Sequence, residues 1–202
     1  SSASGLLMIP GEEVSARIWG GDIPIHLNGI GISRVVEPID AGGVVETLQA
    51  NVDSILDAGG IAQLNHPNAC WAFDHKDIVQ VRGSSLMEVY NGWPGANSEG
   101  GSGKHSAEDM WDYVLSTGQV IFGVATDDAH HYSDFTHTLA NPGRGWVMVR
   151  ASELSQVEIV NSLATGQFYF STGVELSRVE VSDESVLLDI VQYRDYVYRT
   201  RF

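Results

Sequence analysis

The order of helices, glycines and apolar runs constrains the fold of this chain more than any other feature of its sequence. In the clearest segment, apolar residues recur at helical spacing from 107 to 115, with a capping-box-like start at Ser106 and a stop at Gly118. Two further helices are expected over 44–58 and 153–164, each ending near glycine. Each predicted helix leads directly into a short apolar run with the length of a strand. This repeated order is typical of parallel α/β architecture.

Strands are expected where a short apolar run is bounded by polar residues or glycine. In the first part of the chain the expected strands are 6–9, 23–32, 61–64, 86–90, 120–125, 146–149 and 168–170. Beyond Gly173 the pattern changes to alternation, which favours short antiparallel strands at 174–176, 179–181, 186–191 and 196–202. We therefore expect two units, a main α/β unit over 1–173 and a small antiparallel β appendage over 174–202.

Charge and cysteine content exclude several functions. The chain has 11 Lys and Arg against 26 Asp and Glu, a formal net charge of −15 that would repel a nucleic-acid backbone. No apolar run approaches the roughly 18 residues of a membrane span, so we expect neither nucleic acid nor membrane as a partner. Cys70 stands alone and supplies neither an internal disulfide nor a cysteine-based zinc site. We expect a soluble protein, with the cytoplasm as the favoured compartment.

Polar side chains with metal-binding chemistry follow or interrupt several predicted strands. In chain order they are Glu12 and Glu13, His26, His66 within Asn65-His66-Pro67, Asn91, and Asp128 with His130. In parallel α/β folds such groups gather at the carboxyl ends of the strands. Imidazoles and carboxylates that meet at one point bind a divalent cation, and one carboxylate can bridge two cations. The sequence therefore predicts the site of a divalent-metal hydrolase.

Each of these residues also has a simpler structural interpretation. The flanks of His26 are apolar, and such a histidine is more often a hydrogen-bonded core residue than a ligand. Glu12-Glu13 alone is most often a solvated turn, Asn65-His66-Pro67 could end a strand, and Asp128 could belong to a helix cap. The joint placement of all of them at strand ends favours the metal-binding interpretation.

Five motifs in this order resemble those of the PHP (polymerase and histidinol phosphatase) family. They are Pro10-Gly11-Glu12-Glu13, Ile25-His26-Leu27-Asn28, Asn65-His66-Pro67, Glu88-Val89-Tyr90-Asn91-Gly92 and Asp127-Asp128-Ala129-His130. The closing run from Gly145 to Gly173 is similar to the branch of these metallohydrolases that includes carbaryl hydrolase. The resemblance covers about residues 6–173. It implies a distorted (β/α)7 barrel that holds up to three divalent ions of zinc, manganese or iron.

The resemblance also implies a ligand role for each matching residue. Glu13 matches a carboxylate that bridges two ions, and His26 and His66 match the histidines that complete one of these two positions. Asp128 matches a ligand of the other bridged ion, and His130 matches a ligand of the third ion. Glu13 and Asp128 are accordingly expected in catalysis, in which a metal-activated water attacks a phosphoester or a related centre.

Residues outside this ligand set are expected to contact substrate. Arg144 lies in a loop rich in glycine and proline and is expected to hold a substrate anion by two hydrogen bonds, with a surface ion pair as the alternative. Asn91 closes a strand at the same end and is also expected to bind substrate. Trp71, Phe73 and Trp93 follow strand ends, where they form pocket walls or pack as lids over the core.

One part of the family pattern is missing from this sequence. Members of the family open with a strand carrying His-x-His and an aspartate, and no residue before Gly11 supplies them. We expect that the chain lacks the family's first βα unit, and the alternative is a reduced site. The expected function is metal-dependent hydrolysis of a small anionic or ester-type substrate, with phosphoesters as the first choice. The alternatives are a carbamate, amide or ester hydrolase of the same fold, or a catalytically inert PHP-like module.

Overall fold

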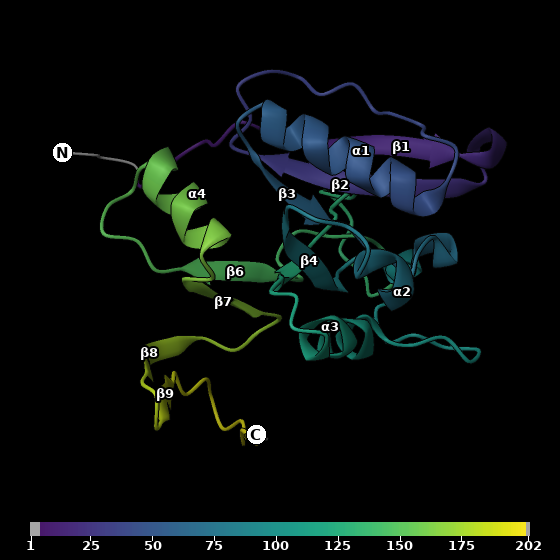
Figure 1. Ribbon diagram of the computed structural model, residues 1–202. Coiled ribbons are helices and arrows are strands. Elements are labelled where there is room, and N and C mark those ends of the chain that lie inside the picture. The colour runs from purple at the N-terminus through teal and green to yellow at the C-terminus, as the bar shows by residue number, and fades with distance from the viewer. Residues whose placement is uncertain (1–4, 201–202) are drawn as a thin grey trace.

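A computed structural model describes residues 5–200 of the chain (Figure 1). Its strands are β1 (Gly11–Ile18), β2 (Ile23–Ile30), β3 (Ile61–Leu64), β4 (Ser84–Asn91), β5 (Phe122–Thr126), β6 (Trp146–Val149), β7 (Phe168–Ser171), β8 (Leu176–Val181) and β9 (Val186–Ile190). Its α-helices are α1 (Val44–Asp57), α2 (His75–Ile78), α3 (Ala107–Ser116) and α4 (Gln156–Ala164). Short 3-10 turns lie at Trp19–Gly21, Ala69–Trp71 and Pro94–Ala96.

Five strands form one mixed sheet in the order β1-β2-β3-β4-β5. The pairs β1-β2 and β2-β3 are antiparallel, whereas β3-β4 and β4-β5 are parallel. Only residues 19–22 join β1 to β2, which is too short for the crossover that a parallel pair requires. The connections from β3 to β4 and from β4 to β5 are long enough to hold α2 and α3, so these strands run parallel.

The expected (β/α)7 barrel is wrong. Within residues 5–200 the largest sheet has five strands, and its edge strands β1 and β5 each pair on one side only, so the sheet is open. β6 pairs with β7, and β8 with β9, in two separate antiparallel sheets. A closed barrel needs every strand to pair on both sides. The periodicity of the sequence predicts the separate strands, but it does not specify which strands pair with each other.

The start of the sheet also differs from the expectation. Residues 6–9, expected as a strand, carry no regular structure, and the first strand runs instead over Gly11–Ile18. Val14, Ala16 and Ile18 are buried and alternate with exposed residues, which is the period of a strand with one covered face. Glu13 therefore lies inside a strand and not in a turn that follows one.

The core lies between the sheet and α1, which runs along β1 and β2 (Figure 1). Leu48, Val52 and Ile55 recur on one stripe of α1 and are fully buried. They pack in one cluster with Val14 and Leu27, which face each other across the β1-β2 pair. The helix thus covers one face of this hairpin and leaves its opposite face to the polar residues.

The predicted helices and the later strands agree with the structure in most places. The cap of α3 is confirmed, since the Ser106 hydroxyl accepts a hydrogen bond from the Asp109 amide at 3.0 Å. The helix expected from 153 starts at Gln156. A strand expected over 196–202 is absent up to residue 200, and residues 201–202 lie outside the described part. No helix within the described residues has the length and apolar character needed to span a membrane.

Candidate metal centre

The face of the β1-β2 hairpin that points away from α1 carries the first two candidate ligands. Glu13, Ser15 and Arg17 alternate with the buried residues of β1, so their side chains share this face. His26 of β2 lies directly opposite Ser15 in the antiparallel register. Cross-strand neighbours lie close enough for their side chains to interact. The hairpin therefore brings Glu13 and His26 together although they are remote in sequence.

The third candidate ligand, His66, follows β3, which pairs with β2. Its backbone has a φ of +25°, which is uncommon for a residue with a side chain. The backbone N–H of His66 donates a hydrogen bond of 2.7 Å to the carboxylate of Glu88. The His66 side chain is 6% exposed. A strained backbone held by a buried acceptor fixes the direction of this imidazole.

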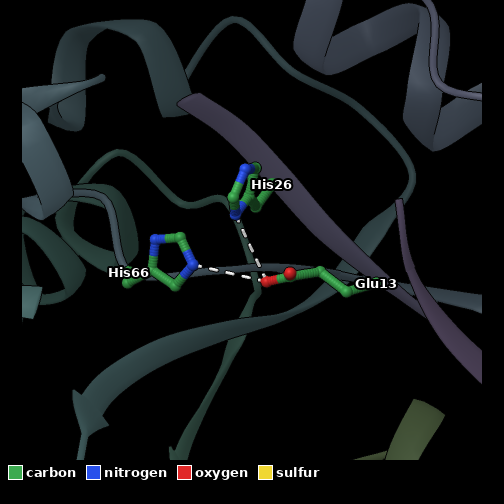
Figure 2. A group of neighbouring side chains, drawn as sticks. All are labelled: Glu13, His26 and His66. Carbon is green, nitrogen blue, oxygen red and sulfur yellow. Dashed lines mark hydrogen bonds and ion pairs between the residues drawn. The ribbon is translucent and has the colours of Figure 1, made fainter. Parts of the chain in front are cut away.

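The three side chains converge on one carboxylate oxygen (Figure 2). His26 Nδ1 and His66 Nε2 each lie 3.4 Å from Oε1 of Glu13. The amide of Asn65 donates to the same oxygen at 3.1 Å. One ligand atom from each of Glu13, His26 and His66 lies within 4.8 Å of the others. Such a group of one carboxylate and two imidazoles has the spacing needed to bind a cation.

The donor set fits a divalent transition metal. Two neutral imidazoles and a carboxylate are ligands for zinc, iron and manganese, and three protein ligands leave coordination positions open for water and substrate. Nε2 of His26 is buried and has no hydrogen-bond partner among the described residues. An unpaired buried polar atom costs free energy, so this arrangement does not serve stability alone.

The electrostatics of the centre couple the carboxylate to both imidazoles. Burial by itself favours the neutral acid, but hydrogen bonds with His26 and His66 and the charge of His26 hold the pKa of Glu13 well below its usual range. Burial lowers the pKa of His66, but Glu13, Glu88 and Asp128 outweigh it and raise that pKa above the ordinary value. Without a cation, the pair therefore favours a charged carboxylate beside a protonated imidazole.

A bound cation must replace the proton on His66, so metal affinity will depend on pH. We expect the affinity for Mn²⁺ to fall as the pH drops through the raised pKa of His66, by about tenfold per pH unit for each proton released. Calorimetric titrations in two buffers of different ionisation enthalpy measure both the affinity and the number of protons. An affinity independent of pH, with no proton release, would contradict the assignment of His66 as a ligand.

Glu88 of β4 is the buried acceptor that ties the strand ends together, and it is 3% exposed. Its Oε2 accepts from the His66 amide and, at 2.9 Å, from the Asn91 side chain. Its Oε1 accepts from the Thr126 hydroxyl at 2.7 Å and from the Gln63 amide at 3.3 Å. Burial raises the pKa of Glu88, although the hydrogen bonds and His66 oppose it. Sequence places Glu88 in a motif but does not distinguish it from a solvated glutamate.

Asp128 and His130 lie on the wall of the same pocket as the three converging residues. Asp128 has a φ of +48°, and its carboxylate accepts a hydrogen bond of 3.3 Å from Asn91. His130 is 65% exposed, and its Nδ1 donates to the backbone oxygen of Asp128 at 2.7 Å. Neither belongs to a group of three ligand atoms within 4.8 Å among the described residues. Their roles as ligands of further ions stay predictions.

The two residues expected to bind substrate have partners within the protein. The guanidinium of Arg144 donates to the backbone oxygens of Thr136 and Leu139 and does not line the pocket. The carboxylate of Asp127 accepts from the Arg144 backbone amide at 2.6 Å and holds this loop against β5. The side-chain amide of Asn91 donates hydrogen bonds to the carboxylates of Glu88 and Asp128. Substrate binding by Arg144 and Asn91 therefore stays a prediction.

The pocket over the centre has a volume of about 420 Å³, which lies within the range of small-molecule sites. Besides the candidate ligands it is lined by Arg17, Pro24, Ala69, Cys70, Trp93 and His131. Of the aromatic residues expected in its walls, Trp93 lines it, while Trp71 and Phe73 line a second cavity. Arg17 is a charged pocket residue that the sequence analysis did not single out. Its spacing from Glu13 on an alternating strand is the signal that places it on this face.

Comparison with known proteins finds a similarity in structure but none in sequence. No protein-family model and no curated protein matches this chain by sequence. The fold is similar to that of a two-domain protein from Bacteroides vulgatus that contains a predicted PHP-like metal-dependent phosphoesterase, with a TM-score of 0.51 and 16% identity. The match covers 92% of this chain and 55% of the other, so the chain spans about half the length of this neighbour. At this identity the likeness shows the fold, and the carbaryl-hydrolase branch stays a prediction.

Proposed function

We propose that this protein is a metal-dependent hydrolase that cleaves phosphoesters. The observation that carries the proposal is the convergence of Glu13, His26 and His66 within 4.8 Å at the floor of a pocket large enough for a small molecule. The description of the structural neighbour as a predicted metal-dependent phosphoesterase supports the same chemistry. Carboxylate and imidazole donors that leave open coordination positions are the arrangement that metal-assisted hydrolysis requires.

In this proposal the protein's own residues bind the cation and orient the carboxylates around it. Glu13, His26 and His66 bind the cation, and Asn65 keeps the Glu13 carboxylate in place through its 3.1 Å hydrogen bond. A divalent cation, when bound, supplies an activated water and positive charge for the phosphoryl group. Asp128 on the adjacent wall accepts a proton or binds a second cation, and Asn91 keeps its carboxylate oriented.

The assay that tests the proposal measures the hydrolysis of three substrates by the protein after loading with Mn²⁺ or Zn²⁺. We expect hydrolysis of p-nitrophenyl phosphate that a chelator abolishes, with much slower turnover of p-nitrophenyl acetate and of an aryl carbamate. Asp128→Asn keeps the shape of the side chain and is expected to lower kcat by about 100-fold. Turnover of the carbamate or acetate without the phosphate would favour the alternative hydrolase, and no turnover with any metal would favour an inert module.

A further inference from the structure

Arg17 lies on the same face of the hairpin as the metal centre and closer to the β1-β2 turn than Glu13. It lies four residues after Glu13 on β1, so the two Cα atoms are separated by roughly 13 Å along an extended strand. Its Nη1 donates a 3.1 Å hydrogen bond to the backbone oxygen of Gly21, in the turn that joins β1 to β2. This bond draws the guanidinium toward the turn and away from Glu13. Both Glu13 and Arg17 nevertheless line the same pocket.

The guanidinium of Arg17 has no acidic partner among residues 5–200. Arg34 and Arg178 are paired with carboxylates. What distinguishes Arg17 from the other arginines without an acidic partner is that it lines the pocket. Arg17 is also the sole lysine or arginine among the pocket-lining residues. The planar guanidinium retains donors that match the geometry of a carboxylate or phosphate.

Uncharged groups form part of the pocket lining near Arg17 and the candidate ligands. Pro24 faces Arg17 across the β1-β2 pair, and Ala69, Cys70 and Trp93 complete this part of the lining. Trp93 is 37% exposed, so its ring is available to a ligand. The pocket therefore combines a cation-binding centre, a fixed positive charge at Arg17 and several uncharged wall residues.

We propose that Arg17 binds a second anionic group of the substrate, so that the substrate carries two acidic groups on either side of an uncharged body. The assignment of the first group, a phosphoryl group at the Glu13 end, rests on the proposed function. The second group is a carboxylate or a phosphate, because both match the guanidinium in charge and in hydrogen-bond geometry. The uncharged body packs against Trp93 and Pro24.

The test measures binding to the Mn²⁺-loaded full chain by calorimetry, with stable phosphonates in place of the phosphoester. Straight-chain alkylphosphonates are compared with ω-carboxyalkylphosphonates of the same chain length, over a series of lengths. At one or two lengths we expect the carboxylate form to bind about tenfold more tightly, the effect of one charge-assisted hydrogen-bonded contact. In Arg17→Gln this preference is expected to fall below about twofold, while binding of the simple alkylphosphonates stays unchanged.

Two further variants separate a specific contact from a general charge effect. Arg17→Lys keeps the charge without the planar fork and is expected to retain part of the preference. Arg34→Gln removes a positive charge that is paired with Asp57 outside the pocket and is expected to retain all of it. A carboxylate preference that survives in Arg17→Gln, or that is absent from the wild type at every length, would overturn the inference.

Hydrolysis of p-nitrophenyl phosphate distinguishes a failure of this inference from a failure of the proposed function. If the protein shows the Arg17-dependent preference but hydrolyses no phosphoester, the second anion site is supported and the proposed function is contradicted. If the protein hydrolyses the phosphoester without any carboxylate preference, the proposed function is supported and the second anion site is contradicted. Absence of phosphonate binding at every length overturns the inference about Arg17.

Discussion

Replacing Glu13 with glutamine is expected to lower the affinity for Mn²⁺ by more than about 100-fold, because even residues that merely support a ligand cost roughly 10- to 100-fold when they are changed. Oε1 of Glu13 is the atom that both imidazoles approach at 3.4 Å, so its charge is central to the donor set. The amide has the same shape but no charge. Metal content by elemental analysis and affinity by calorimetry measure the effect.

The adjacent glutamate provides the matched control. Glu12 lies on the opposite face of β1, where its carboxylate accepts a 2.6 Å hydrogen bond from the Val36 amide. Glu12→Gln is therefore expected to leave metal affinity unchanged within about twofold. Both variants are expected to unfold cooperatively, because Glu13 serves the site and not the packed core. Equal metal loss in both variants, or unchanged metal content with a lost fold in Glu13→Gln, would contradict the assignment.

Glu88→Leu is expected to destabilise the protein by about 3 kcal/mol and to weaken Mn²⁺ binding by about 10- to 100-fold. The substitution removes the acceptor for the buried His66 backbone amide and for the Thr126 hydroxyl. The side chains of Gln63 and Asn91 lose one acceptor each and keep Asn65 and Asp128. His66 then loses the contact that holds its positive φ. Urea unfolding gives the stability, and calorimetry gives the metal affinity.

A milder change at Glu88 separates the effect on stability from the effect on metal affinity. Glu88→Gln keeps one acceptor oxygen, so we expect a smaller loss of stability than in Glu88→Leu and an intermediate metal affinity. Glu108→Leu is the control, because Glu108 is exposed in the first turn of α3 and remote from the pocket. It is expected to change stability by less than about 0.5 kcal/mol. Full metal affinity in a destabilised Glu88→Leu protein would show that Glu88 serves packing alone.

The local elements were predictable from the sequence because their signals are local. The α1 and α3 helices follow from apolar spacing and glycine stops, and β3 and β4 from short apolar runs between polar residues. The first strand was missed because its central residues are Glu, Ser and Arg, which read as a turn unless the alternation with Val14 and Ala16 is followed. The polar residues of β1 lie on the face that carries the candidate metal ligand Glu13.

The candidate site was predictable in part. Glu13, His26 and His66 are the expected residues that the structure brings within reach of one cation, and Asp128 and His130 line the same pocket. Glu88 and Arg17 could not be assigned in advance, because a glutamate in a buried network and an arginine in a pocket have the same residue types as solvated ones. Only the positions of their neighbours distinguish them.

Local sequence patterns predict α1, α3, α4 and most of the strands, and they identify the residues that offer imidazole and carboxylate groups. The open, mixed sheet and the contact between Glu13 and His66, 53 positions apart in the chain, follow only from the three-dimensional packing. The two groups of features differ in the range of the interactions that produce them. Apolar periodicity and helix caps act over one or two turns of chain, whereas strand pairing and the convergence of side chains depend on contacts between segments that packing alone brings together.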